Sequence, residues 1–353
     1  MVFLTDLDGD DYVFAYGLFG VQYETLTSEK KKTILELYSL LSQSADRVDH
    51  LQSQSHGLPN IGPSSSTFVA YWLRSEEYEK LKETSSWKEF WSGLPGDAGV
   101  WREVMTVPKS RFMHASSQEV ESGMSSLLKL KQSSDEGYWG VYRHRLSETP
   151  DKHTDPNDTF TSPYVTAKAS SDKPVISIAK GVGAEIRPGR VRPSIPDNLC
   201  FVREGQRQPH CPKEEIDAWI ESITPHAQSW ITHLNEEREK TGVISLTTHL
   251  GHENPSTKST ADPFADVEGD RIPETNQLAY FLDLAHFELA GRSHRGHVQL
   301  RKNVMELYGP GGKLSTMGKA ALYVELCVLK SGDMDAEYIG CMEGTGLMYL
   351  SEA

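Results

Sequence analysis

The order of strand-like and helix-like segments constrains the fold most, because they alternate on both sides of one long polar stretch. Residues 12–23, YVFAYGLFGVQY, are rich in aromatic and β-branched side chains and predict a long strand. Residues 146–173 are rich in Ser, Thr, Asp and Pro, lack periodicity and predict a surface connection. The chain therefore predicts one domain of two α+β halves, about 1–145 and 174–353, that pack their sheets together.

Further segments fill in this pattern. Apolar residues at helical spacing predict helices at 29–51, 75–91, 120–130, 213–236 and 278–291, the last of these ending at Gly291. Short β-rich runs predict strands at 67–73, 174–179, 198–203, 243–249, 322–326 and 337–347.

Charge and cysteine content limit the partners. The 353 residues carry a net charge of -14, which argues against nucleic acid and anionic membranes as partners, since both require clusters of Lys and Arg. No apolar run reaches membrane-spanning length, and the acidic N-terminus lacks the features of a secretory signal. The 4 cysteines form no CxxC pair. We expect a cytoplasmic protein whose partners are small molecules or a second copy of itself.

Common catalytic motifs are absent or incomplete. The run Gly309–Lys313 lacks the Ser or Thr of a phosphate-binding loop, because Leu314 follows the lysine. No Gly-x-Ser-x-Gly elbow occurs, which removes the commonest hydrolase interpretation.

Two unusual clusters remain, residues 137–145 (GYWGVYRHR) and residues 292–297 (RSHRGH). On residue chemistry alone, a histidine just past a helix is more often a cap or a solvated group than a metal ligand. Neutral imidazole is nevertheless a good axial ligand for heme iron. His297 is therefore the candidate ligand whose surroundings decide its interpretation.

Short motifs, in a shared order over most of the chain, carry a family resemblance: residues 20–23 (GVQY), 69–72 (VAYW), 137–145, 198–206, 293–297, 322–325 and 337–347. Through them the chain resembles the heme-containing aldoxime dehydratases, which convert R–CH=N–OH into a nitrile and water. The resemblance implies an α+β fold, in which two ferredoxin-like halves form a β-barrel-like core flanked by helices, of the dimeric α+β barrel type. It also implies a homodimer.

The resemblance assigns site residues by position. The second histidine of the family's Ser-His-x-x-His motif, the proximal ligand of heme b, corresponds to His297. The family's distal arginine corresponds to Arg145, where a permanent charge can orient an oxime oxygen.

The other distal positions differ from the family pattern. The family has a serine where this chain has Glu204, and a histidine where it has Val324. No histidine follows His297 in the sequence. In the family's reaction the oxime nitrogen binds ferrous heme and a distal acid protonates the leaving hydroxyl, which contributes roughly 10²–10⁴-fold.

Valine has no proton to give, so Glu204 is the candidate replacement acid, with a buried carboxyl favoured in its neutral form. The competing interpretation of Glu204 is an ion pair with Arg145 or Arg203. Val324 is expected to pack the distal pocket together with Met113.

Three functions remain open. The first is a heme-dependent lyase that dehydrates an aldoxime or a related N–O substrate. The second is a heme enzyme on the same scaffold with different nitrogen chemistry, namely N–O or N–N bond formation or cleavage, or oxidation. The third is a heme-binding or sensor protein without turnover.

Overall fold

The computed structural model describes residues 2–7, 12–53, 57–119, 122–133, 142–146, 160–166, 172–183, 185–251 and 274–352. The strands are β1 (Phe3–Thr5), β2 (Val13–Gln22), β3 (Arg47–Gln52), β4 (Ser65–Trp72), β5 (Val100–Pro108), β6 (Phe112–Ser116), β7 (Leu130–Gln132), β8 (Val165–Thr166), β9 (Val175–Ile176), β10 (Arg190–Val191), β11 (Leu199–Arg207), β12 (Val243–Gly251), β13 (Glu274–Phe281), β14 (Ala321–Leu329) and β15 (Met334–Ile339). The helices are α1 (Ser28–Ser42), α2 (Ser75–Glu83), α3 (Ser85–Gly93), α4 (Tyr142–Leu146), α5 (Lys213–Ser222), α6 (Thr224–Glu236), α7 (Arg238–Thr241), α8 (Leu284–Ser293) and α9 (Arg295–Tyr308).

Most described strands join one sheet, in the order β10-β15-β5-β2-β4-β3-β12-β13-β11-β14-β6-β1-β7. Within it the block β5-β2-β4-β3 belongs to the first half and the block β12-β13-β11-β14 to the second. Each block follows the chain order strand, helix, strand, strand, helix, strand, which is the ferredoxin-like arrangement. The two blocks meet edge to edge, where Leu51 of β3 pairs with Gly251 of β12.

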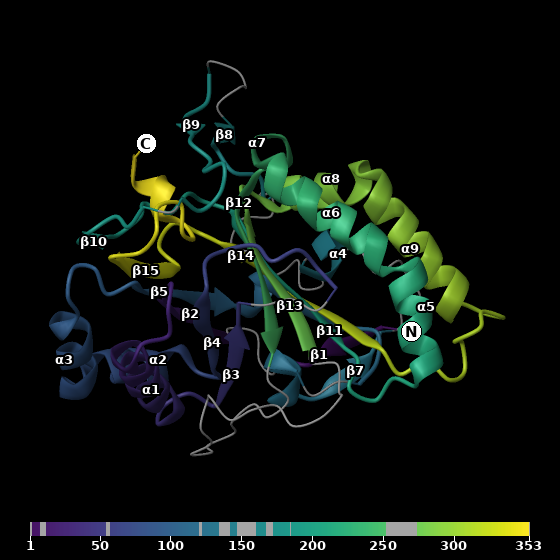
Figure 1. Ribbon diagram of the computed structural model, residues 1–353, viewed down its shortest axis with the longest axis horizontal. Coiled ribbons are helices and arrows are strands. Elements are labelled where there is room, and N and C mark those ends of the chain that lie inside the picture. Colours follow the sequence, from purple (N-terminus) through teal and green to yellow (C-terminus); the bar gives the residue numbers. More distant parts are fainter. Residues whose placement is uncertain are drawn as a thin grey trace.

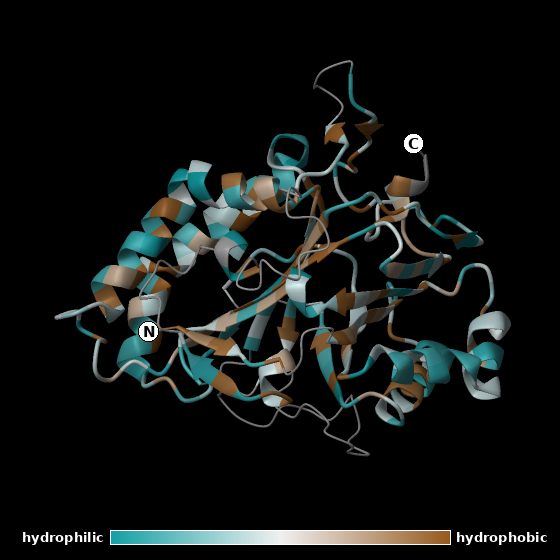
Figure 2. Cartoon of the chain, turned by 180° about the vertical axis from the view of Figure 1, so that it is seen from behind, coloured by the Kyte–Doolittle hydropathy of each residue, from teal (hydrophilic) through white to brown (hydrophobic). Residues whose placement is uncertain are grey.

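The sheet has an inner face and a helix-covered face. The inner core joins side chains of both blocks, including Tyr16 on β2, Val69 on β4, Phe201 on β11 and Tyr280 on β13. Helices α1 to α3 cover the outer face of the first-half strands, and α6 and α8 cover that of the second-half strands. The two groups of helices, α1 to α3 and α5, α6, α8 and α9, lie at opposite ends of the molecule (Figure 1). The central strands are largely hydrophobic and the helices largely hydrophilic along their outer surfaces (Figure 2). The predicted class, an α+β fold with a barrel-like core flanked by helices, is confirmed.

The first-half helices pack tightly because their apolar residues recur at helical spacing. Thr27 caps α1 by accepting from Lys30 N, and Ile34, Leu37 and Leu41 are buried. The predicted helix 75–91 is instead two helices, since Thr84 leaves the helical conformation and caps α3 through Trp87 N. The helix predicted at 213–236 is likewise interrupted at Ile223, and α6 starts with a proline in its first turn.

Several predicted elements differ from the observed ones. Residues 278–281 belong to strand β13, so the predicted helix 278–291 is wrong in its first turn, and α8 continues past Gly291 to Ser293. The predicted helix 29–51 ends at Ser42, and residues 47–52 form β3. Within the predicted helix 120–130, a short 3₁₀ turn covers Gly123–Ser126.

Predictions for the other strands fare better. Those at 12–23, 67–73, 198–203, 243–249 and 322–326 are confirmed as β2, β4, β11, β12 and β14. The segments 174–179 and 337–347 are strands only in part, as β9 and the end of β15.

The predicted connection 146–173 falls largely on residues outside the described ranges, so this boundary stays a prediction. Along the parts of the chain that the structure describes, no helix combines the length and apolarity that crossing a membrane requires.

Candidate active site on the helix-covered face of the second half

Three predicted residues share one face of neighbouring strands. Glu204 on β11 is the register partner of Val324 on β14, and Val324 is in turn the partner of Ala115 on β6. Met113, two residues before Ala115, therefore lies on the same face, because side chains alternate along a strand. Met113, Ala115 and Val324 belong to the apolar cluster of the helix-covered face. The strands thus bring Glu204, Val324 and Met113 together as one wall.

The carboxyl of Glu204 stands alone on this wall. Among the hydrogen bonds and ion pairs of the described residues, none involves its side chain. Removal from water raises the pKa of Glu204 from 4.5 to about 7. A substantial fraction of Glu204 is therefore protonated at neutral pH.

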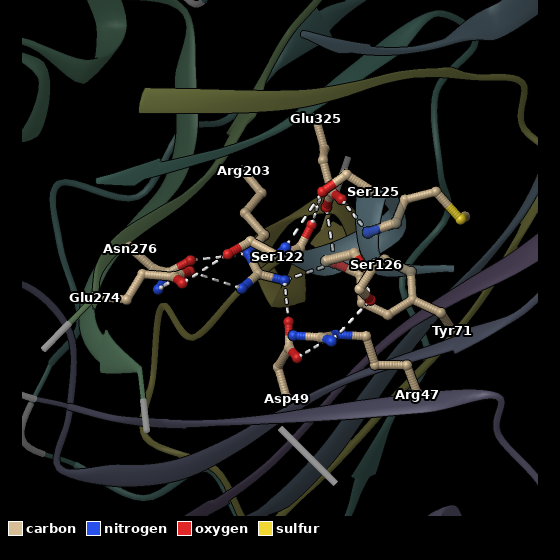
Figure 3. A network of polar contacts seen from close by, with 12 residues as sticks. Arg47, Asp49, Tyr71, Ser122, Ser125, Ser126, Arg203, Glu274, Asn276 and Glu325 are labelled. Carbon is tan, nitrogen blue, oxygen red and sulfur yellow. Dashed lines mark hydrogen bonds and ion pairs between the residues drawn. The ribbon is translucent and has the colours of Figure 1, made fainter. Parts of the chain in front are cut away.

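The ion pairs considered for Glu204 are not formed. The adjacent Arg203 points to the inner face, where its Nη1 lies 2.8 Å from Oδ2 of Asp49 and 2.6 Å from the Tyr71 hydroxyl (Figure 3). No ion pair joins Glu204 to Arg145 in the described part of the chain. The salt-bridge interpretation of Glu204 is wrong for this reason.

Helix α4 adds polar side chains from a second element. It packs against β6. Tyr142 is 9% exposed and belongs to the same apolar cluster as Val324. Arg145 lies three residues later on α4 and is partly buried, so one side of the helix carries both.

Two charged residues of the candidate site shift the pKa of Tyr142. Burial raises its pKa first, the charge of Glu204 raises it further, and Arg145 lowers it. Glu204 and Arg145 therefore both act on the Tyr142 hydroxyl. The run 137–140, part of the motif that marks Arg145, lies outside the described residues.

The candidate ligand His297 occupies the first turn of α9. It lies past the end of a helix, as predicted, since α8 ends at Ser293, but it also belongs to a second helix that begins at Arg295. Its ring lies 4.7 Å from the Trp230 ring of α6, and Trp230 belongs to the same apolar cluster as Val324 and Met113. The wall and the candidate ligand therefore border one cluster.

One hydrogen bond fixes the tautomer that suits a metal. His297 Nδ1 lies 2.5 Å from the carbonyl oxygen of Gly291, which can only accept, so Nδ1 carries the proton. Nε2 is then a bare acceptor, and no described residue binds it. Burial lowers the pKa of His297, which keeps the imidazole neutral. A neutral histidine held through its other nitrogen is the usual form of an iron ligand.

The helices beside His297 carry exposed apolar side chains. Helix α9 has no buried residue along its whole length. Leu289 on α8 is 59% exposed, and Val298 and Met305 on α9 are 48% and 66% exposed. The features that fit heme are the free Nε2 of His297 and the apolar cluster beside its ring, which holds Trp230 and Val324.

The other histidine of the motif has a different setting. His294 precedes α9 and stacks on His233 of α6, with ring centroids 4.4 Å apart and planes at 14°. Burial and the neighbouring His233 lower the pKa of His294.

The sequence did not identify three residues of this region, namely Tyr142, Trp230 and Phe287. Tyr142 and Arg145 are three positions apart in the quoted run, and this spacing was the available signal for Tyr142. Trp230 and Phe287 carry no such signal, because an isolated aromatic residue at helical spacing is typical of any core.

The fold and site define a heme-binding α+β barrel protein with its candidate ligand on the second half. Residues 17–347 match the model of the family described as haem-containing dehydratase. The chain belongs to this family. It is 24% identical over 294 residues to the phenylacetaldoxime dehydratase of Bacillus sp. (strain OxB-1), covering 81% of this chain and 74% of that protein. It is 23% identical over 301 residues to the aliphatic aldoxime dehydratase of Rhodococcus globerulus, covering 83% and 74%.

Solved structures agree in fold. A crystal structure of aldoxime dehydratase superposes with a TM-score of 0.76 at 18% identity, covering 98% of this chain and 90% of that one. A second, an aldoxime dehydratase in complex with butyraldoxime, gives 0.73 at 17% identity, covering 98% and 88%. Family membership confirms heme as the cofactor and a heme-dependent lyase as the class of enzyme.

Proposed function

We propose that this enzyme dehydrates an aldoxime to a nitrile and water, with Glu204 as the distal acid. The observation that carries the proposal is the lone carboxyl of Glu204, whose pKa is raised to about 7, on the wall that also holds Val324. Support for the reaction comes from the aldoxime dehydratases that the chain resembles.

In this proposal His297 holds the heme through Nε2, with Nδ1 anchored on the Gly291 carbonyl. Bound there, heme would supply an iron centre for the oxime nitrogen and a source of electron density for the N–O bond. Trp230 fixes the His297 ring from the side. The apolar cluster with Trp230 and Phe287 would pack against the porphyrin.

The chain's own contribution to the chemistry is a proton transfer. Glu204 in its neutral form gives its proton to the hydroxyl oxygen of the substrate, so that oxygen leaves as water when the N–O bond breaks. The resulting carboxylate accepts the proton that the C–H carbon loses as the nitrile forms. Glu204 returns to its starting state, and R–CH=N–OH is converted into R–C≡N and H₂O without another reactant.

Other wall residues orient the substrate. Arg145 on α4 carries a permanent charge suited to an oxime oxygen. Val324 is 1% exposed and Met113 is 4% exposed within an apolar cluster, which favours an apolar group R. We therefore propose aldoximes with aliphatic or aromatic side chains as substrates.

The test compares two glutamates with the same raised pKa. Glu103 on β5 also has a pKa raised to about 7, but it lies on the inner face and accepts from the Tyr338 hydroxyl. With heme-loaded, reduced protein and phenylacetaldoxime or butyraldoxime, Glu204→Gln should lower nitrile formation about 10²-fold or more, since the acid is removed. Glu103→Gln should retain most of the activity. Equal rates for wild type and Glu204→Gln contradict the role of Glu204.

A second function is favoured by Val324 specifically. Valine at this position leaves the wall without a histidine, and a heme site without that acid suits other nitrogen chemistry. Turnover of hydroxylamine- or hydrazine-type compounds, without nitrile formation from any aldoxime, supports this alternative. A heme that binds ligands without any turnover supports a sensor.

A further inference from the structure

The side chain of Tyr142 is fixed on the wall of the candidate site. Its ring lies 4.9 Å from the Phe287 ring of α8, with planes at 43°. It also shares an apolar cluster with Met113, Ala115 and Val324. Contacts on both sides leave the ring little freedom, so the hydroxyl has a defined position.

The hydroxyl of Tyr142 differs from those of the inner tyrosines. Tyr16 and Tyr71 donate to Glu325 at 2.6 Å and 2.7 Å, and Tyr338 donates to Glu103. No described residue accepts from Tyr142. Unlike the hydroxyl of Tyr280, that of Tyr142 is not among the fully buried unpaired atoms of the described residues, so a ligand atom can reach it and supply a partner.

The neighbouring charges suit a donor. After burial, the largest effects on the pKa of Tyr142 come from Glu204, which raises it, and Arg145, which lowers it, ahead of Cys200 and Glu288. Burial raises the pKa of the Tyr142 hydroxyl, so the group keeps its proton at all working pH values. The hydroxyl therefore remains a hydrogen-bond donor while the carboxyl beside it gains and loses a proton.

We propose that Tyr142 donates a hydrogen bond to the hydroxyl oxygen of the bound oxime and so holds the leaving group toward Glu204. The inference rests on the proposed function and deepens it, because it adds a substrate-binding residue that the family motif does not specify. Tyr142 occupies one of the two variable positions between the glycine and the first arginine of the run 137–145.

The test removes only the hydroxyl. Heme-loaded Tyr142→Phe and wild type are titrated with butyraldoxime, which carries the hydroxyl oxygen, and with imidazole, which does not, and binding is followed by the visible absorption of the heme. The loss of one hydrogen bond should weaken butyraldoxime binding about three- to tenfold. Imidazole affinity should change by less than about twofold, since that ligand offers no such oxygen.

A matched control is available in the first half. Tyr38 on α1 is also 9% exposed and packs against a phenylalanine, Phe68, with ring centroids 5.4 Å apart. Tyr38→Phe should leave both affinities unchanged. The unfolding midpoint of the heme-free variants should stay within the range of wild type, which separates lost binding from lost folding.

Each other outcome overturns the inference. Equal butyraldoxime affinity in wild type and Tyr142→Phe shows that the hydroxyl makes no bond to the oxime. An equal loss for butyraldoxime and imidazole assigns Tyr142 a packing role only. A wild-type heme protein that binds imidazole but gives no response to butyraldoxime overturns the proposed function together with this inference, whereas the first two outcomes leave the proposed function intact.

Discussion

The charged side chains on the two faces of strands β11 and β14 differ in whether they have partners. On the inner face, Arg203 binds Asp49, Tyr71 and Asn276, and Glu325 accepts from Tyr16, Tyr71 and Met124 N (Figure 3). On the helix-covered face, the next residue along β11, Glu204, has no partner among the described residues, and Val324 precedes Glu325 with an apolar side chain. Neighbours one position apart therefore have opposite surroundings.

This difference separates a structural network from a chemical one. Burial acts to raise the pKa of Asp49, but Arg47 and Arg203 outweigh it and lower the pKa, so this carboxylate stays charged and ties the strands together. A carboxyl without partners keeps its proton up to neutral pH and has it available for transfer. The inner network also joins the two halves, since Asp49 and Tyr71 belong to the first half and Arg203 and Glu325 to the second.

The largest contrast is expected for the same substitution at the two adjacent positions. Arg203→Met leaves Asp49 with Arg47 alone and Glu274 with Arg207 alone as cationic partners, and should lower the free energy of unfolding by about 3–5 kcal/mol. Glu204→Met removes a charge that has no partner and should not lower it. Urea unfolding of the heme-free proteins at pH 8 measures both. Comparable losses at the two positions contradict the distinction between the faces.

A smaller effect depends on pH. The pKa of Glu204 has its ordinary value of 4.5 in the unfolded chain and is raised to about 7 in the folded protein. Ionisation of Glu204 therefore favours the unfolded chain. Wild type has no such cost below pH 4.5 and the full cost above pH 7. Glu204→Gln should therefore gain about 1–3 kcal/mol over wild type as the pH rises from 5 to 8.

This gain is read as the difference between wild type and Glu204→Gln in urea unfolding at the two pH values. A difference that stays constant from pH 5 to pH 8 shows that Glu204 ionises as an ordinary exposed carboxyl. A difference that shrinks with pH shows that the folded protein prefers the charged form.

Sequence patterns predict some of the buried strands of this fold and miss others. Strands β2 and β4 follow from aromatic and β-branched runs. Strand β13 does not, because Leu278 and Tyr280 face the inner core while Ala279 and Phe281 face the helices. A strand that is buried on both faces has no alternation of period two, and its leucines also match helical spacing.

Strands with buried polar residues were equally hard to predict. In β3, Arg47 and Asp49 form an ion pair at 2.6 Å and belong to the inner network, yet as sequence they continue a helix-like charged segment. Strand β5 was not predicted, because Arg102 and the buried Glu103 interrupt its Val- and Thr-containing run. Such residues are satisfied by partners distant in the chain, and a local pattern holds no information about them.

The candidate site was also predictable from the sequence only in part. The family motif leads to His297, Arg145, Glu204 and Val324 by position, but the motif does not tell whether Glu204 is paired. The inward direction of Arg203 decides that question, and it follows from strand register rather than from residue type. The place of Tyr142 in the site follows only from the packing of α4 on β6.

The most direct test of a heme site on the helix-covered face is the heme content of two histidine variants. His297→Ala removes the group whose Nδ1 binds the Gly291 carbonyl, and His294→Ala removes its neighbour in the same motif, which stacks on His233. After heme loading and gel filtration, the visible absorption spectrum of His297→Ala should lack bound heme, whereas that of His294→Ala should match wild type. A His297→Ala protein that retains heme with an unchanged spectrum contradicts His297 as the ligand.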